Sequence, residues 1–222
     1  MPTQTLIPRQ TIPAGQQALV GSLTLTRARA HEFCGPARRT LAVMLAGSTQ
    51  KATGPVFWIS PAWAPVQLNP EGLQPFANPG RFTFAQVRRP EDMLWCMEEI
   101  LRAGVAPLVV ADLSAPLALT PVRRLHLAAE TGARTGRHAP LGVLLTPGAG
   151  GAQGVESRWH MAPDHSQDRH AWRLERRRAR VAPPKCWQVT RQDGHWTLGG
   201  CPAPRPCPTP DPSRTLTGQA SR

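Results

Sequence analysis

The sequence predicts an α/β fold with a mostly parallel sheet flanked by helices and an antiparallel extension of C-terminal strands. Between residues 28 and 145, short apolar runs alternate with segments of helical periodicity, which is typical of strands joined by crossover helices. After Gly154, short strand-like segments follow one another with no helical segment between them. At 222 residues, the chain can bury one sizeable core and still carry tails.

The first predicted elements form a strand–turn–helix unit. A strand is predicted over residues 28–34, a turn at Gly35-Pro36, and a helix over residues 38–46, because its apolar residues recur on one face. A buried strand is expected at residues 55–60. Residues 61–80 are rich in proline and are predicted to form a loop with a short helix.

The next unit contains the clearest helix of the chain. Alternating apolar residues predict a strand over residues 82–87. A helix is predicted to start after Pro90, because Glu91 and Asp92 suit the positive N-terminus of a helix, and to stop at Gly104.

Two further buried strands complete the predicted parallel sheet. Residues 105–113 form a continuous apolar run that ends in the carboxylate of Asp112, as in a buried parallel strand. A threonine–proline pair starts a helix over residues 122–131, and residues 141–145 form another apolar run.

The C-terminal strand segments each contain one tryptophan. They cover residues 158–162, 171–181, 186–192 and 195–198. We expect them to form an antiparallel meander that extends the sheet. One tryptophan per strand favours packing in the core over the stacking of nucleic-acid bases.

Composition divides the chain into three parts. Residues 1–27 show no sustained period and are predicted to form an extended arm with at most one short helix or strand. Residues 28–200 form the folded domain. Residues 201–222 are rich in proline and arginine and are predicted to be a disordered tail.

Charge and cysteine content limit the class of protein. The formal net charge of +12 makes attraction to nucleic acid or to an acidic partner plausible. No apolar run is long enough to span a bilayer and no N-terminal signal is visible, so we expect a cytoplasmic protein with no membrane partner. The five cysteines lack the paired spacing of a zinc site and are predicted to be thiols in a reducing compartment.

The strand–turn–helix unit has the frame of a phosphate-binding loop but not its chemistry. Such a loop needs a second glycine, a lysine that reaches the β- and γ-phosphates, and a hydroxyl that binds Mg²⁺. The residues of the degenerate loop are Gly35, Pro36, Ala37, Arg38, Arg39 and Thr40. We therefore expect no tight binding of ATP and no cofactor. Arg38 and Arg39 either meet a phosphate at the helix start or are solvated.

Asp112 is the candidate Walker B aspartate, because it ends a buried strand where such a residue would hold Mg²⁺. Without the loop lysine and hydroxyl, one carboxylate has little to organise. The alternatives are a weak metal contact and a cap of the following turn, and we predict no metal site.

These elements resemble the core of the RecA-like recombinase fold. Within that superfamily, the chain is similar to the ImuA-type mutagenesis accessory proteins of bacteria. The resemblance covers residues 28–198 and rests on four passages: residues 55–59, 95–104, 123–130 and 172–176.

The resemblance implies a RecA-like domain that acts as a non-catalytic adaptor in SOS-induced translesion DNA synthesis and mutagenesis. The implied partners are a Y-family polymerase homologue, an alternative replicative polymerase and RecA. RecA-type enzymes place a catalytic glutamate after the second strand, where this chain has Ser60, so no catalytic residue and no ATPase activity are expected. The alternative is a DNA-binding or weakly ATP-binding modulator of recombination.

A basic segment is the candidate contact for DNA or for an acidic partner. Its members are Arg173, Arg176, Arg177, Arg178, Arg180, Lys185 and Arg191, against the single acidic residue Glu175. On a strand, Arg176, Arg178 and Arg180 share one face, so this face could meet phosphates at several points. The other reading is a solvated face of the sheet.

The remaining polar clusters predict no site. His160, His165 and His170 recur at intervals of five, which fits no known arrangement of metal ligands, so a polar loop is expected. No recognisable nucleophile motif is formed by Ser114, Ser157 and His126.

Overall fold

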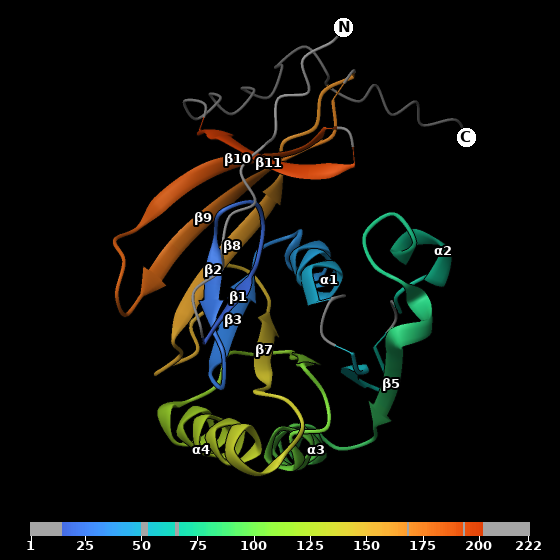
Figure 1. Ribbon diagram of the computed structural model, residues 1–222, viewed down its shortest axis with the longest axis vertical. Coiled ribbons are helices and arrows are strands. Elements are labelled where there is room, and N and C mark those ends of the chain that lie inside the picture. Colours follow the sequence, from blue (N-terminus) through green and yellow to red (C-terminus); the bar gives the residue numbers. More distant parts are fainter. Residues whose placement is uncertain (1–14, 50–52, 65–66, 168, 193, 202–222) are drawn as a thin grey trace, which may run out of the picture.

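A nine-stranded mixed sheet forms the centre of the molecule (Figure 1). The computed structural model describes residues 15–49, 53–64, 67–167, 169–192 and 194–201. The strands of the sheet are β3 (Ala30–Cys34), β4 (Val56–Pro61), β5 (Phe82–Val87), β6 (Leu108–Asp112), β7 (Leu141–Thr146), β8 (Ser157–Pro163), β9 (Ala171–Ala179), β10 (Lys185–Gln192) and β11 (His195–Gly200). Their order across the sheet is β11-β10-β9-β8-β3-β7-β6-β4-β5.

The sheet has a parallel part and an antiparallel part. Strands β8, β3, β7, β6, β4 and β5 pair in parallel, whereas β8–β9, β9–β10 and β10–β11 pair antiparallel. The mixed α/β fold predicted from the sequence is thus confirmed. The first of the four C-terminal strands, β8, pairs in parallel with β3 and antiparallel with β9, so it joins the antiparallel meander to the parallel part of the sheet.

Helices cover both faces of the parallel part. The helices are α1 (Arg38–Ser48), α2 (Pro70–Leu73), α3 (Pro90–Ala103) and α4 (Leu119–Thr135), with a 3₁₀ turn at Pro79–Arg81. Figure 1 shows α3 and α4 together on one side of the sheet and α1 on the other. Side chains alternate between the two layers, so that Val110 packs in the α1 layer and Val109 packs in the layer of α3 and α4.

Short contacts at α3 and α4 explain two glycines. Gly104 ends α3 with a φ of +58°, a conformation that favours glycine. A side chain at Gly132 of α4 would collide with the backbone carbonyl of Leu101, so this glycine lets the two helices approach closely.

A β-hairpin precedes β3 in the region that the sequence predicts as an arm. Strands β1 (Gln16–Ala18) and β2 (Thr24–Thr26) pair antiparallel, and the loop between them buries Leu19 and Val20 in the α1 layer. Each strand is three residues long, which is too short to produce a detectable period in the sequence. Residues 1–14 lie outside the described part, as does the predicted tail from residue 202 onward.

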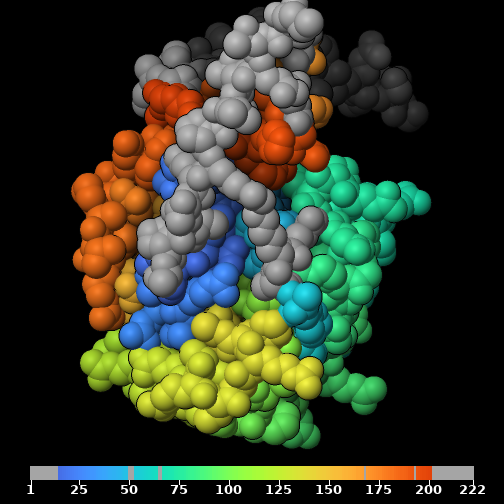
Figure 2. Space-filling view, viewed as in Figure 1, coloured from blue at the N-terminus to red at the C-terminus, as the bar shows by residue number. Residues whose placement is uncertain are grey.

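The edge strands of the sheet are β11 and β5. Figure 2 shows the orange segment of the antiparallel strands on the left and the green segment that contains β5 on the right. Of the helices described, none has both the length and the apolar character that a membrane span requires.

The expectation of five free thiols is wrong. Cys186 of β10 and Cys201 after β11 form a disulfide, because the pairing of the two strands brings their Cα atoms to 5.4 Å. Cys34 and Cys96 are free thiols, and Cys207 lies outside the described residues. Burial raises the pKa of the Cys34 thiol to about 11, so this cysteine is protonated at neutral pH.

Candidate functional site

The turn between β3 and α1 is tight and admits only glycine at its first position. Gly35 has a φ of +89°, and a Cβ there would lie 2.5 Å from the carbonyl oxygen of Met161 and 2.7 Å from Nε2 of His160. Cys34 ends β3 and Arg38 begins α1, so three residues make the whole turn. A loop of this length cannot wrap around a phosphate group.

The backbone donors of the turn are already used within the chain. The N–H of Gly35 donates to the carbonyl of Gly148 at 2.9 Å, and the N–H of Ala37 donates to the carbonyl of Met161 at 3.0 Å. Pro36 has no N–H. The turn therefore does not fit the triphosphate of ATP in the way that a phosphate loop does, where such donors face the ligand.

The structure brings the two arginines of the turn and Asp112 together. Nε of Arg39 donates to Oδ2 of Asp112 at 2.6 Å, and Nη2 of Arg38 lies 3.9 Å from Oδ1 of the same carboxylate. Arg38 also donates to the carbonyl of Gly35 at 3.3 Å. Asp112 thus faces the guanidinium groups of Arg38 and Arg39.

Thr40 does not join this cluster. It lies in the first turn of α1 and lines a separate hollow with Asn69 and Gly72, whereas Asp112 lines the neighbouring pocket. The hydroxyl of Thr40 and the carboxylate of Asp112 therefore do not converge on one metal position.

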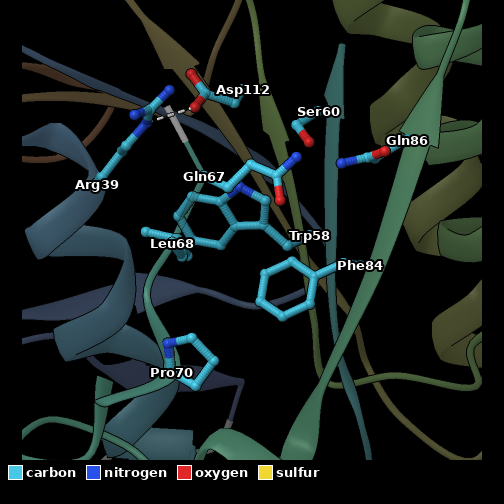
Figure 3. A pocket seen from close by; sticks show the side chains of 9 residues that line it. All are labelled: Arg39, Trp58, Ser60, Gln67, Leu68, Pro70, Phe84, Gln86 and Asp112. Carbon is cyan, nitrogen blue, oxygen red and sulfur yellow. Dashed lines mark hydrogen bonds and ion pairs between the residues drawn. The ribbon is translucent and has the colours of Figure 1, made fainter. Parts of the chain in front are cut away.

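A pocket of about 260 Å³ opens beside the Arg39–Asp112 ion pair (Figure 3). Its walls are Arg39, Trp58, Ser60, Gln67, Leu68, Pro70, Phe84, Gln86 and Asp112. Register pairs Trp58 with Phe84 and Ser60 with Gln86, so these four side chains lie on one face of β4 and β5. Sequence reasoning identified Asp112 and Arg39 but missed the rest of the wall. The sequence signal that could have indicated this wall is the alternation along the two predicted strands, which places Trp58 with Ser60, and Phe84 with Gln86, on one face.

Comparison of the chain with protein-family models and with curated proteins found no match.

The predicted common face of Arg176, Arg178 and Arg180 is wrong. The register of β8 and β9 shifts between Arg158 and Trp159, so that Arg176 lies opposite Trp159 and Arg178 lies opposite Arg158. This β-bulge leaves Arg177 as an extra residue and puts Arg176 and Arg178 on different faces of the sheet. Arg180 follows the end of β9, and its Nε lies 3.5 Å from Glu156 Oε2.

The basic segment is divided between two faces. One face, here called the tryptophan face, carries Trp159, Trp172, Trp187 and Trp196, together with Arg176, Lys185 and Arg191. The opposite face carries Arg173 and Glu175, with Arg177 at the bulge and Arg178 beyond it. Glu175 accepts from Arg173 at 2.8 Å and from Arg177 at 3.1 Å, and these ion pairs lower the pKa of Glu175 although burial opposes them.

Cations of the tryptophan face lie over aromatic rings. The guanidinium of Arg176 is 5.2 Å from the centroid of the Trp187 ring, Lys185 Nζ is 5.5 Å from the same ring, and Arg191 is 5.4 Å from Trp196. Within the described residues, none of these three cations has a carboxylate partner. Their charge therefore remains available to an anionic partner.

A buried carboxylate that the sequence analysis overlooked ties the carboxyl end of β3 to the loop after β7. Oε1 of Glu32 accepts from Thr146 at 2.7 Å, from the N–H of Gly151 at 2.8 Å and from the N–H of Ala152 at 2.9 Å. Its Oε2 accepts from Arg158. Because all these partners belong to the protein itself, we assign Glu32 a structural role.

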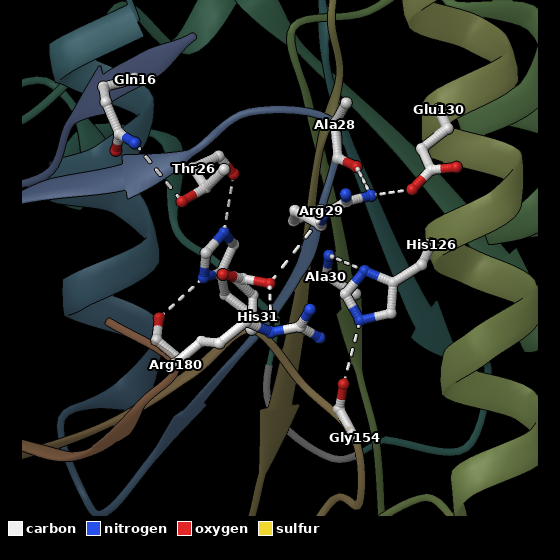
Figure 4. A network of polar contacts seen from close by, with 12 residues as sticks. Gln16, Thr26, Ala28, Arg29, Ala30, His31, His126, Glu130, Gly154 and Arg180 are labelled. Carbon is white, nitrogen blue, oxygen red and sulfur yellow. Dashed lines mark hydrogen bonds and ion pairs between the residues drawn. The ribbon is translucent and has the colours of Figure 1, made fainter. Parts of the chain in front are cut away.

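Two histidines close the amino end of β3 (Figure 4). Nδ1 of His31 lies 2.7 Å from the hydroxyl of Ser157, and its Nε2 lies 2.9 Å from the carbonyl of Thr26. Burial lowers the pKa of His31 to about 4 and also lowers the pKa of His126. Both rings are therefore neutral at pH 7; His31 links β3 to β2 and β8, and His126 links α4 to β3 and to the carbonyl of Gly154.

The three histidines at intervals of five do not converge. His160 lies against the Gly35 turn. His165 and His170 lie in the loop before β9, where the centroids of their rings are 5.4 Å apart. In the part of the chain that the structure describes, no group of three or more His, Cys, Asp or Glu side chains is placed to hold a metal ion.

Proposed function

We propose that this protein is a non-catalytic accessory protein of SOS-induced translesion DNA synthesis and mutagenesis, built on a degenerate RecA-like domain. Its proposed partners are a Y-family polymerase homologue, an alternative replicative polymerase and RecA. Support for the RecA-like assignment comes from the parallel strands β3, β4 and β6 and their helices, which follow one another in the order that the resemblance implies.

The observation that carries the non-catalytic role is the contact between Arg39 and Asp112. A Walker B aspartate must leave its oxygens to Mg²⁺ and its water shell, but here Nε of Arg39 donates to Oδ2 at 2.6 Å. The donors of the Gly35 turn are also bonded internally. A domain arranged in this way acts through its surfaces, which is what an adaptor requires.

Affinity co-purification from DNA-damaged cells tests the adaptor role. The tagged protein is recovered at moderate salt with nuclease present, and the bound proteins are identified. We expect a Y-family polymerase homologue or RecA among them, because protein contacts survive removal of DNA. Recovery of neither would contradict the adaptor role.

An ATPase assay with the purified protein tests the non-catalytic role separately. We expect no turnover above background. Turnover that Asp112→Asn abolishes would show that the carboxylate works in catalysis, and the proposal would then fail.

The second candidate function is direct DNA binding by a modulator of recombination. It is favoured by Arg176, Lys185 and Arg191, which have no carboxylate partner among the described residues and line one face of the antiparallel strands. If this face binds single-stranded DNA, a plot of log K against log salt concentration has a slope of about −0.7 for each phosphate contact. Each of the charge reversals Lys185→Glu and Arg191→Glu should therefore reduce the magnitude of this slope by about 0.7. The matched control is Arg173→Glu on the opposite face, which leaves the slope unchanged.

A further inference from the structure

The pocket beside Asp112 lies where the sheet changes direction. β4 and β6 are neighbours, but the chain leaves β4 toward β5 on one side and leaves β6 toward β7 on the other. In open α/β sheets, ligands bind in the crevice outside the carboxyl ends of strands at such a switch point. Ser60 near the end of β4 and Asp112 at the end of β6 both line the pocket.

Aromatic and aliphatic side chains form the floor of the pocket. Trp58 and Phe84 are register partners on adjacent strands, and Leu68 and Pro70 close the opposite side (Figure 3). Trp58 is only 3% exposed, whereas Phe84 is 47% exposed on the edge strand. A half-exposed aromatic ring beside a buried one offers a stacking surface for a flat ring.

Polar side chains lie two residues further along β4 and β5, on the same face as the aromatic pair. Gln86 and Ser60 are register partners, and Gln67 faces them across the pocket. Each carboxamide has an oxygen acceptor and two N–H donors. This combination matches the edge of a nucleobase, which also presents donors and acceptors side by side.

The ion pair closes the remaining side of the pocket. Arg39 belongs to the first turn of α1, where the helix dipole adds positive potential. Its side chain is 29% exposed although it contacts Asp112, so the guanidinium can still meet an oxygen of a sugar or phosphate. A charged end next to an aromatic floor is the arrangement that a nucleotide needs.

We propose that this pocket binds a single nucleobase, stacked on Phe84 beside the buried ring of Trp58 and hydrogen-bonded by the carboxamides of Gln67 and Gln86. At about 260 Å³ the cavity accommodates one ring system with its attached groups and excludes a duplex or a helix. The base belongs either to a free mononucleotide or to an unpaired position in a single strand. This site does not use the degenerate phosphate loop, and the proposal does not rest on the adaptor role.

Isothermal titration calorimetry of the full chain tests the proposal. The probes are AMP, GMP, CMP and UMP, and a single-stranded oligodeoxynucleotide of mixed sequence. We expect saturable binding of at least one probe, which Phe84→Ala weakens about tenfold or more because a stacking surface is lost. We expect Gln86→Leu to change the order of preference among the four bases, because one donor and acceptor pair is removed.

Matched variants separate the pocket from general effects. Trp95→Ala removes an aromatic ring that is 64% exposed on α3 and does not line the pocket, so it leaves binding unchanged. Phe84 and Gln86 are themselves exposed, and circular dichroism checks that their variants remain folded. Saturable binding of a mononucleotide that Phe84→Ala weakens identifies a free nucleotide as a ligand. The same loss seen only with the oligonucleotide identifies an unpaired base.

Two results would overturn the proposal. One is the absence of saturable binding for every mononucleotide and for the oligonucleotide. The other is binding that Phe84→Ala and Gln86→Leu leave as it is in the unaltered chain. A pocket that takes only a side chain of a protein partner would produce the first result.

Discussion

Nε of Arg39 and Oδ2 of Asp112 lie 2.6 Å apart, which joins the first turn of α1 to the end of β6. The two residues are 73 positions apart in the chain, and β3, which leads into α1, is separated from β6 by β7. The contact therefore depends on the assembled sheet. It also makes Arg39, just after the Gly35 turn, and Asp112 partners of each other.

Removal of either partner of this ion pair should destabilise the protein. Arg39→Ala leaves the carboxylate of Asp112, which is 6% exposed, with the more distant Arg38 as its remaining ion-pair partner among the described residues. We expect a loss of about 1 to 3 kcal/mol in the free energy of unfolding. A double-mutant cycle with Asp112→Ala, measured by urea unfolding, isolates the coupling. A coupling energy near zero would show that the pair contributes nothing.

Gly35→Ala should destabilise the turn between β3 and α1. The residue has a φ of +89°, and its new Cβ would lie 2.5 Å from the carbonyl oxygen of Met161. We expect a cost of about 2 kcal/mol or more, from the left-handed backbone and from the collision. Gly148→Ala is the matched control, because that glycine has a φ of +59° and nothing within 4 Å of the added atom. Equal losses for the two variants would rule out the collision as a cause.

Stability should fall as the pH drops from about 6.5 to about 4. The pKa of His31 is lowered by burial from 6.5 to about 4, so the unfolded chain binds a proton in this range and the folded chain does not. The stability that this shift contributes is present above pH 6.5 and is lost as the pH falls toward 4. The loss amounts to about 3 kcal/mol.

Unfolding by urea at several pH values checks the role of His31. His31→Gln should flatten the pH dependence between 6.5 and 4, since the carboxamide does not titrate. The control is His195→Gln at the exposed start of β11, which should leave the pH dependence of stability as it is in the unaltered chain. A pH dependence that survives unchanged in His31→Gln would assign it to other groups.

Glu32→Ala should be more damaging than the loss of any exposed carboxylate. Glu32 is fully buried and accepts hydrogen bonds from Thr146, Arg158 and the backbone of the loop after β7. Its removal leaves the guanidinium of Arg158 without its carboxylate, at a cost of about 3 to 5 kcal/mol. Thermal or urea unfolding measures the loss, with Glu99→Ala as the exposed control. Similar stability of the two variants would contradict the structural role of Glu32.

Local patterns were sufficient for most elements of the parallel sheet. The helix from Pro90 to Gly104 was predictable because proline, acidic residues and glycine mark its ends. The hairpin before β3 was not, since its strands are stabilised by burial of Leu19 and Leu25 rather than by their own pattern. The division of the basic segment between two faces of the sheet could not be predicted either, because the bulge at Arg177 depends on the register between β8 and β9.

The candidate site was predictable only in part. The degenerate loop and Asp112 follow from residue types and spacing, which the chain displays directly. The pocket needs register as well, because Trp58 meets Phe84, and Ser60 meets Gln86, only when β4 and β5 pair. Cys186 and Cys201 likewise meet only through the pairing of β10 with β11.

The sequence by itself determined the α/β class, the order of most helices and strands, and the absence of the phosphate-loop lysine. These properties depend on residue identity and on periodicities of a few residues, which are local. Only the tertiary structure decided that Arg39 faces Asp112, that the tryptophan face and the opposite face divide the arginines, and that a pocket lies on one face of β4 and β5 beside Asp112. These contacts join residues that are distant in the chain, and their geometry is set by strand order, register and packing across the sheet.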